Sequence, residues 1–221
     1  MVNKDDEQLD KLRKHADDTL RLWSNAQKPE RERMICRAFL RCLGVPFREE
    51  EFRADSGEPV DISFRLARFQ ITELLDIGRR RTDEWRDRKR QYQDAQSLTD
   101  LVEPVRSPDH LSPCSISYRE ILGFLLERFS QKAQHYGVAN CAKLDALLCV
   151  GLKGRHLWPL DITLHLPEIR ELQTQGWRSV SMLFIPYSVV VFAGESAPDF
   201  LRAVEGQVLT KWPRRDGWFD P

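Results

Sequence analysis

The chain has 221 residues, 41% of them hydrophobic, which suits one domain with a core of its own. Its 34 Lys and Arg residues balance 34 Asp and Glu residues, so the formal net charge of zero argues against a basic protein that coats nucleic acid non-specifically. No run approaches the roughly 18 apolar residues of a membrane span, and no apolar secretory signal begins the chain. The five cysteines show no CxxC spacing. We therefore expect a cytoplasmic protein without membrane contact.

The first quarter of the chain predicts two amphipathic helices. Apolar residues at helical spacing predict a helix over residues 5–24, within an N-terminal helical segment of residues 1–26. We expect this helix to pack on the sheet through three apolar side chains, Leu12, Leu20 and Trp23. A second helix follows, with Pro29 in its first turn and Gly44 just past its end.

Residues 27–221 are expected to form one α/β domain. Alternating and continuous apolar runs predict three antiparallel strands, then a buried strand and a strand pair: 47–53, 60–65, 68–75, 144–152, 180–185 and 189–193. Further helices are predicted over 79–97, after the capping box of Ser117 and Glu120, and from near Ser196. Residues 98–114 contain prolines and predict an irregular, mobile connector. This order predicts a mixed central sheet with helices on both faces.

One charged residue of the second predicted helix lies on its apolar face. Ile35, Cys36, Phe39 and Leu43 follow Glu32 at the spacing of a single helix face. A carboxylate that faces the core needs a cationic partner, a metal ion or a network of hydrogen bonds. The alternative is an exposed carboxylate in the first helical turn, where it stabilises the helix dipole.

The predicted hairpin of residues 58–76 gathers polar side chains on one face. Asp61 lies on the polar face of one strand, and Gln70 and Thr72 share a face of the next strand. If residues 66–67 make a two-residue turn, Asp61 lies opposite Thr72, with Gln70 as its diagonal neighbour. An ordinary amphipathic hairpin with its polar face in water fits the same pattern.

These residues resemble the active-site pattern of the PD-(D/E)XK restriction-endonuclease-like superfamily. The matching positions are Glu32, the string PVD that ends at Asp61, and the string FQIT with Gln70 and Thr72. The chain is most similar to a family of uncharacterised bacterial proteins labelled "putative endonuclease", through strings such as EPVDISF, LDIGRRRTDEWR and KLDALLCVGL. The resemblance implies a three-layer α/β/α fold. It also implies phosphodiester hydrolysis with Mg²⁺ or Mn²⁺ held by Glu32, Asp61 and Gln70.

Two positions depart from the superfamily pattern. Gln70 stands where an acidic residue is usual, and an amide can ligate a cation only through a neutral oxygen. Thr72 stands where a lysine is usual and supplies no positive charge. A Lys or Arg from a neighbouring element could restore that charge, Glu73 could join the site, or catalysis could be lost.

A basic segment follows the hairpin. Residues 79–90 hold seven basic and three acidic side chains around Trp85, and they begin with three arginines, Arg79, Arg80 and Arg81. These arginines could restore the missing charge of the site, or they could bind the phosphates of DNA or RNA. A solvated helix with ion pairs at i, i+3 and i, i+4 spacing explains the same composition.

Three functions stay open from the sequence. The first is a metal-dependent endonuclease with Glu32, Asp61 and Gln70 as ligands. The second is a catalytically inactive nuclease fold that binds nucleic acid or a protein, and the third is a structural protein in which the two carboxylates pair with arginines. A separation of about 5–6 Å between the carboxyl groups of Glu32 and Asp61, around an open cleft, would count against the third.

Overall fold

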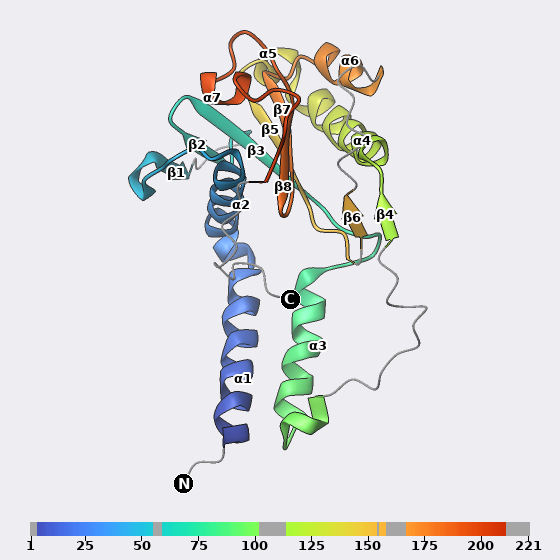
Figure 1. Cartoon of the computed structure of the whole chain (residues 1–221). Helices are drawn as coiled ribbons and strands as arrows, with labels where there is room; N and C mark the ends of the chain where they lie inside the picture. The colour runs from blue at the N-terminus through green and yellow to red at the C-terminus, as the bar shows by residue number, and fades with distance from the viewer. Residues whose placement is uncertain (1–3, 55–58, 102–113, 154, 158–166, 211–221) are drawn as a thin grey trace.

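The fold is built around one mixed sheet (Figure 1). The computed structural model describes residues 4–54, 59–101, 114–153, 155–157 and 167–210. Within these residues, seven strands form the sheet in the order β1-β2-β3-β5-β7-β8-β9; β3, β5 and β7 run parallel and the other neighbours pair antiparallel. The sheet strands are β1 (Phe52–Ala54), β2 (Ile62–Phe64), β3 (Ala67–Leu74), β5 (Asp145–Val150), β7 (Ser179–Phe184), β8 (Tyr187–Ala193) and β9 (Val208–Leu209). A separate parallel pair consists of β4 (Cys114–Ile116) and β6 (Arg155–Leu157).

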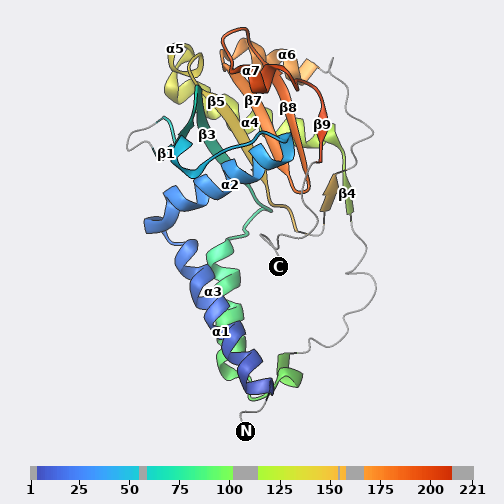
Figure 2. The same ribbon diagram turned by 60° about the vertical axis from the view of Figure 1, so that its left-hand side comes forward.

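Helices cover both faces of the sheet, as the order of elements predicts (Figure 2). The α-helices are α1 (Lys4–Leu22), α2 (Lys28–Leu43), α3 (Arg81–Asp94), α4 (Tyr118–Tyr136), α5 (Val138–Cys141), α6 (Pro167–Thr174) and α7 (Asp199–Arg202). The 3-10 helices are η1 (Asn25–Gln27), η2 (Glu49–Glu51) and η3 (Leu98–Leu101). In the described part of the chain, no helix has the length and apolar character that crossing a membrane requires.

Each face of the sheet has its own hydrophobic core. On the α2 side, Phe39 packs edge-to-face against Phe69 of β3, with ring centroids 5.9 Å apart. On the other side, the predicted capping box begins α4: Ser117 Oγ accepts from the Glu120 backbone N–H at 3.2 Å. This helix then buries Phe129 completely. Burying such side chains contributes about 1.5–3 kcal/mol each.

The predicted packing of the first helix on the sheet is wrong. Helix α1 does not pack on the sheet. It lies beside α3, and the two helices extend together away from the sheet (Figures 1 and 2). Arg13 of α1 donates to the backbone carbonyls of Tyr92 and Ala95, at 2.9 and 3.0 Å, at the end of α3. Leu9 and Ala16 are buried in this contact. Because α2 and α7 already cover the near face of the sheet, α1 packs along α3 instead.

The β1–β2–β3 antiparallel arrangement is confirmed, but its turn differs from the predicted one. Phe64 pairs with Ala67, so residues 65–66 make the two-residue turn. Arg65 has a positive φ of 50° there. The register therefore shifts by two residues, and a shift of two keeps every side chain on its predicted face. The first strand is shorter than predicted because residues 49–51 form η2.

A buried carboxylate ties the three parallel strands together at their amino ends. Asp145 is fully buried and contacts the guanidinium of Arg178, whose Nε lies 3.1 Å from Oδ1. Asp145 also accepts from Ser179 Oγ at 2.7 Å and from the backbone N–H of Arg68 at 2.8 Å. Because it bonds β3 and the start of β7 from its own strand β5, this carboxylate stabilises the sheet from which the β2–β3 hairpin projects.

The remaining predictions are mostly confirmed. The strands predicted for 144–152, 180–185 and 189–193 are β5, β7 and β8. The helix predicted from near Ser196 is the short α7, which Pro198 precedes. The predicted connector begins with η3, and its residues 102–113 lie outside the described residues.

Candidate functional site

Two elements bring the predicted site residues together. The second turn of α2 carries Glu32, which is 8% exposed, as its place in the apolar stripe predicts. The β2–β3 hairpin carries Asp61, Gln70 and Thr72, and Gln70 is 3% exposed. Together with Lys28, which begins α2, these residues form what we call the carboxylate cluster.

Lys28 joins the two carboxylates of the cluster. Its Nζ lies 3.1 Å from Oε1 of Glu32 and 3.0 Å from Oδ1 of Asp61. The two carboxyl groups therefore approach within the separation of about 5–6 Å that suits ligands of one cation. The two acids thus share a lysine instead of pairing with arginines, and the separation meets one part of the criterion that the sequence set.

Hydrogen bonds from β3 orient Asp61. Its Oδ2 accepts from the backbone N–H of Ile71 at 2.7 Å and from Nε2 of Gln70 at 3.1 Å. The same amide nitrogen lies 3.2 Å from the Ile71 carbonyl, and Thr72 Oγ1 donates to Oε1 of Gln70 at 3.4 Å. The Gln70 amide thus turns its nitrogen toward Asp61 and its oxygen toward Thr72. Oδ1 of Asp61 points to the lysine.

The charges of the cluster influence one another. Burial raises the pKa of Glu32, the negative charge of Asp61 raises it further, and Lys28 only partly offsets both. Burial alone would lower the pKa of Lys28, but its hydrogen bonds and charge contacts with Asp61 and Glu32 outweigh that effect and raise the pKa. Lys28 therefore stays protonated to a higher pH than an ordinary lysine, and Glu32 keeps its proton to a higher pH than an ordinary glutamate.

The three predicted arginines lie elsewhere. Arg79 bonds Glu84, with Nε 2.6 Å from Oε1, and Arg81 lies 3.5 Å from Glu73. Among the described residues, no hydrogen bond or ion pair joins Arg79, Arg80 or Arg81 to the carboxylate cluster. Glu73 likewise faces Arg81 rather than the cluster. The cation that sequence reasoning missed is Lys28, although its position four residues before Glu32 was a usable signal.

The cluster offers two carboxylates to a divalent cation. In the described part of the chain, no three His, Cys, Asp or Glu side chains come together as a metal site. Mg²⁺ is commonly held by one or two carboxylates, with water and substrate phosphates completing its shell. Glu32 and Asp61 fit that mode, whereas the oxygen of Gln70 faces Thr72 instead.

Two hollows lie in the described surface apart from the cluster, which lines neither of them. One, of about 780 Å³, lies over β1 and the β2–β3 turn, beside Arg53, Ser63 and Arg68. The other, of about 680 Å³, lies between α1, α3 and the sheet. Lys28 is the most exposed of the three charged residues, with 57% of its side chain exposed against 10% for Glu32 and 11% for Asp61.

Comparisons with known proteins agree with the α/β fold and give two different descriptions of function. A family model described as "Putative endonuclease, protein of unknown function (DUF1780)" matches residues 4–212. A solved structure of the protein of unknown function PA4535 from Pseudomonas aeruginosa strain PAO1, described as "Monooxygenase Superfamily", is similar with a TM-score of 0.63. It is 28% identical in sequence, and the similarity covers 94% of this chain and 96% of that chain. No curated protein matches.

Proposed function

The chain belongs to the DUF1780 family, and we propose that it hydrolyses phosphodiester bonds of nucleic acid with a divalent cation, Mg²⁺ or Mn²⁺, at the carboxylate cluster. The observation that supports this most is the convergence of Glu32 and Asp61 on the ammonium of Lys28. The restriction-endonuclease-like identity of the fold is part of the same proposal. The monooxygenase description belongs to the similar structure alone.

Each residue of the cluster has a part in this reaction. Glu32 and Asp61 would hold the cation, which when bound would supply Lewis-acid polarisation of the phosphoryl group. Asp61 keeps one orientation because Ile71 and Gln70 bond its other oxygen. Burial raises the pKa of Glu32 in the metal-free chain, so this carboxylate would have to release its proton to bind the cation.

Lys28 takes the role of the lysine that Thr72 replaces. Its side chain is 57% exposed and can leave the carboxylates, so its ammonium can bind a phosphate oxygen as negative charge develops there. The charge comes from a helix instead of the neighbouring strand. This explains how a site without the usual strand lysine can still neutralise a phosphoryl group.

A catalytically inactive binding module is the second candidate, and two observations favour it. Lys28 already pairs with both carboxylates, and Gln70 presents a nitrogen rather than an oxygen to Asp61. If the ammonium never leaves, the cluster is a structural ion network. The two candidates differ in whether metal can displace Lys28.

A cleavage assay tests the proposed activity. The purified chain is incubated with duplex DNA, single-stranded DNA and RNA, each with Mg²⁺ or Mn²⁺. We expect slow, metal-dependent cutting that Asp61→Asn abolishes and that the exposed control Asp18→Asn retains. Absence of cutting on every substrate would favour the binding module, and cutting unchanged by Asp61→Asn would place the activity elsewhere.

A further inference from the structure

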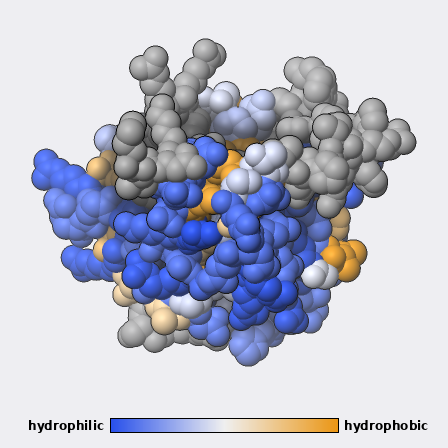
Figure 3. Space-filling model, turned by 90° about the horizontal axis from the view of Figure 1, so that it is seen from below, coloured by the Kyte–Doolittle hydropathy of each residue, from blue (hydrophilic) through white to orange (hydrophobic). Residues whose placement is uncertain are grey.

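A second site lies between α1, α3 and the carboxyl ends of the parallel strands. The pocket has a volume of about 680 Å³ and is lined by Trp23 and Trp85 from the two helices and by Gly151 just after β5. Seen from below, this end of the molecule is mostly hydrophilic, with hydrophobic surface at its centre (Figure 3). The carboxyl ends of parallel strands are the usual ligand-binding edge of an α/β sheet. The volume suits a small organic molecule.

The pocket lining is cationic. Five basic side chains, Arg31, Arg79, Arg81, Arg88 and Lys153, face two acidic ones, Glu73 and Glu84. Arg79 and Glu84 neutralise each other through two contacts of 2.6 and 3.1 Å. The remaining lining therefore keeps an excess of positive charge, which favours an anion with more than one negative charge.

Arg81 is held in place, but its Nε lacks a hydrogen-bond acceptor. Its guanidinium lies 4.7 Å from the ring centroid of Trp23, and a Cβ on Gly151 would collide with its Nη2. Its buried Nε has no hydrogen-bond partner among the described residues, since the nearest Glu73 oxygen is 3.5 Å away. A buried donor without an acceptor costs free energy, which a bound anion would recover.

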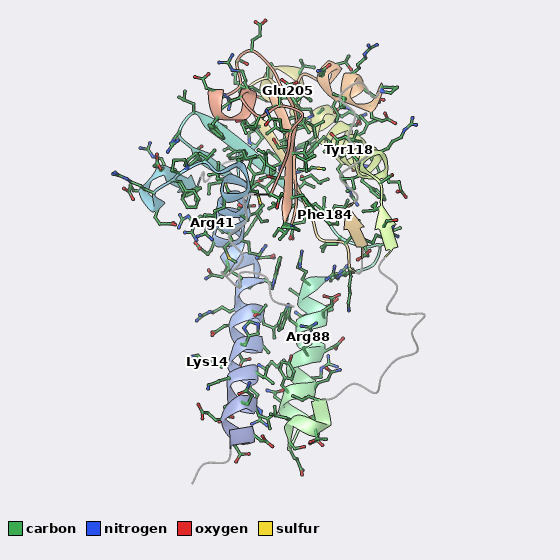
Figure 4. The ribbon with its side chains drawn as sticks, viewed as in Figure 1. Lys14, Arg41, Arg88, Tyr118, Phe184 and Glu205 are labelled. Carbon is green, nitrogen blue, oxygen red and sulfur yellow. The ribbon has the colours of Figure 1, made fainter. Side chains whose placement is uncertain are left out.

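Arg88 repeats this arrangement on the same helix. It lies over the ring of Trp85, 4.9 Å from the centroid, and faces α1 (Figure 4). In the part of the chain that the structure describes, Arg88 makes no ion pair or hydrogen bond. Arg86, which lies on the same helix but does not line the pocket, pairs instead with Asp83 at 2.9 Å. The pocket thus has two arginines that tryptophans orient and that no acid neutralises fully.

We propose that this pocket binds a nucleoside monophosphate group. A phosphate monoester carries a charge of about −1.5 to −2 at neutral pH and accepts bidentate hydrogen bonds from guanidinium groups. The stacked Arg81 and Arg88 supply those donors, and the amino end of α3 adds its positive dipole. Apolar lining from Leu22, Ile35 and Leu152 gives the base a dry surface. The site is separate from the carboxylate cluster and does not depend on the proposed hydrolysis.

Calorimetry with AMP tests the proposal on the full chain. We expect one AMP per chain in the wild type and binding weaker by roughly tenfold or more in Arg88→Gln, because one charge-assisted contact is lost. Arg86→Gln, on the same helix and outside the pocket, should bind as the wild type does. Gly151→Ala, which displaces Arg81, should also weaken binding. Since Arg88 makes no ion pair, its replacement leaves the fold intact.

Four results would overturn the proposal. They are no heat of AMP binding, equal binding by Arg88→Gln and Arg86→Gln, inorganic phosphate binding as tightly as AMP, and equal binding of adenosine and AMP. A 5′-phosphorylated trinucleotide distinguishes the two sources of the ligand: tighter binding than AMP assigns the pocket to a strand end, and weaker binding assigns it to a free nucleotide. Asp61→Asn should leave AMP binding unchanged. The proposal for the pocket and the proposal for the carboxylate cluster can therefore fail independently.

Discussion

Lys28 and Glu32 lie one helical turn apart on α2, and the lysine Nζ is 3.1 Å from Oε1 of the glutamate. The same nitrogen reaches Asp61 at 3.0 Å across to the β2–β3 hairpin. Two elements separated by more than thirty positions in sequence are thus joined through one ammonium. A metal ion can either displace the Lys28 ammonium from this position or be excluded by it.

We predict that Lys28→Met tightens Mn²⁺ binding and abolishes cutting. The Lys28 ammonium lies between the two carboxylates, where Mn²⁺ would bind. Like unit charges about 4 Å apart repel each other by up to about 4 kcal/mol near a protein surface, so the ammonium opposes Mn²⁺ binding. Removing it should therefore raise Mn²⁺ affinity by about tenfold or more, while the phosphate loses its cation. Lys11→Met, which removes an exposed lysine paired with Glu7, is the matched control. Unchanged Mn²⁺ affinity in Lys28→Met would show that metal and lysine do not compete.

We predict that Glu32→Gln stabilises the fold increasingly as the pH rises. The pKa of Glu32 is raised from 4.5 by burial and by Asp61, so the folded chain keeps this proton when the unfolded chain has lost it. Ionisation of Glu32 therefore costs stability above pH 4.5, and the variant escapes that cost. Urea denaturation of both proteins between about pH 4 and about pH 8 measures the difference.

Glu7→Gln provides the opposite sign as a control. The Lys11 hydrogen bond and charge lower the pKa of Glu7, so its ionised form stabilises the fold above pH 4.5. The variant should lose stability relative to the wild type as the pH rises. If the free energies of unfolding of Glu32→Gln and the wild type change with pH in the same way, the raised pKa of Glu32 is contradicted.

The core of the candidate site was predictable from local patterns. Helical spacing predicts that Glu32 faces inward, and strand alternation puts Asp61 and Gln70 on one face. The predicted turn was wrong by one residue, yet the predicted faces held, because the pairing register moved by two. The face on which a strand residue lies depends only on the alternation along its strand, so this error leaves it unchanged. The residue paired with it on the neighbouring strand does change.

Long-range contacts explain what the sequence could not predict. Nothing in the pattern of α1 distinguishes the sheet from α3 as the partner of Leu9 and Ala16. The reach of Lys28 to Asp61 likewise depends on how the hairpin packs beside α2, which local spacing does not encode. The arginines after the hairpin were near the site in sequence only, since Arg79 pairs with Glu84 and Arg81 with Glu73.

We predict that Asp145→Asn destabilises the chain by about 3–5 kcal/mol, because it leaves the charge of Arg178 buried without a counter-ion. Asp145 is fully buried, and the side chain of Arg178 is only 12% exposed. Asp199→Asn, whose carboxylate is 91% exposed beside Arg202, should change the free energy of unfolding by less than about 1 kcal/mol. Equal effects of the two substitutions on urea denaturation would contradict a stabilising role for the buried ion pair of Asp145 and Arg178.

Calorimetric titration with Mn²⁺ tests most directly whether the carboxylate cluster is a metal site. The wild type should bind one Mn²⁺ weakly, since only two carboxylates contribute formal charge, and Mn²⁺ should bind more tightly than Mg²⁺. Asp61→Ala should lose this binding, Asp61→Asn should weaken it while keeping the hairpin hydrogen bonds, and Asp18→Ala should retain it. Circular dichroism confirms that each variant is folded. A folded wild type that binds no Mn²⁺, or an Asp61→Ala variant that binds it equally well, would contradict the account.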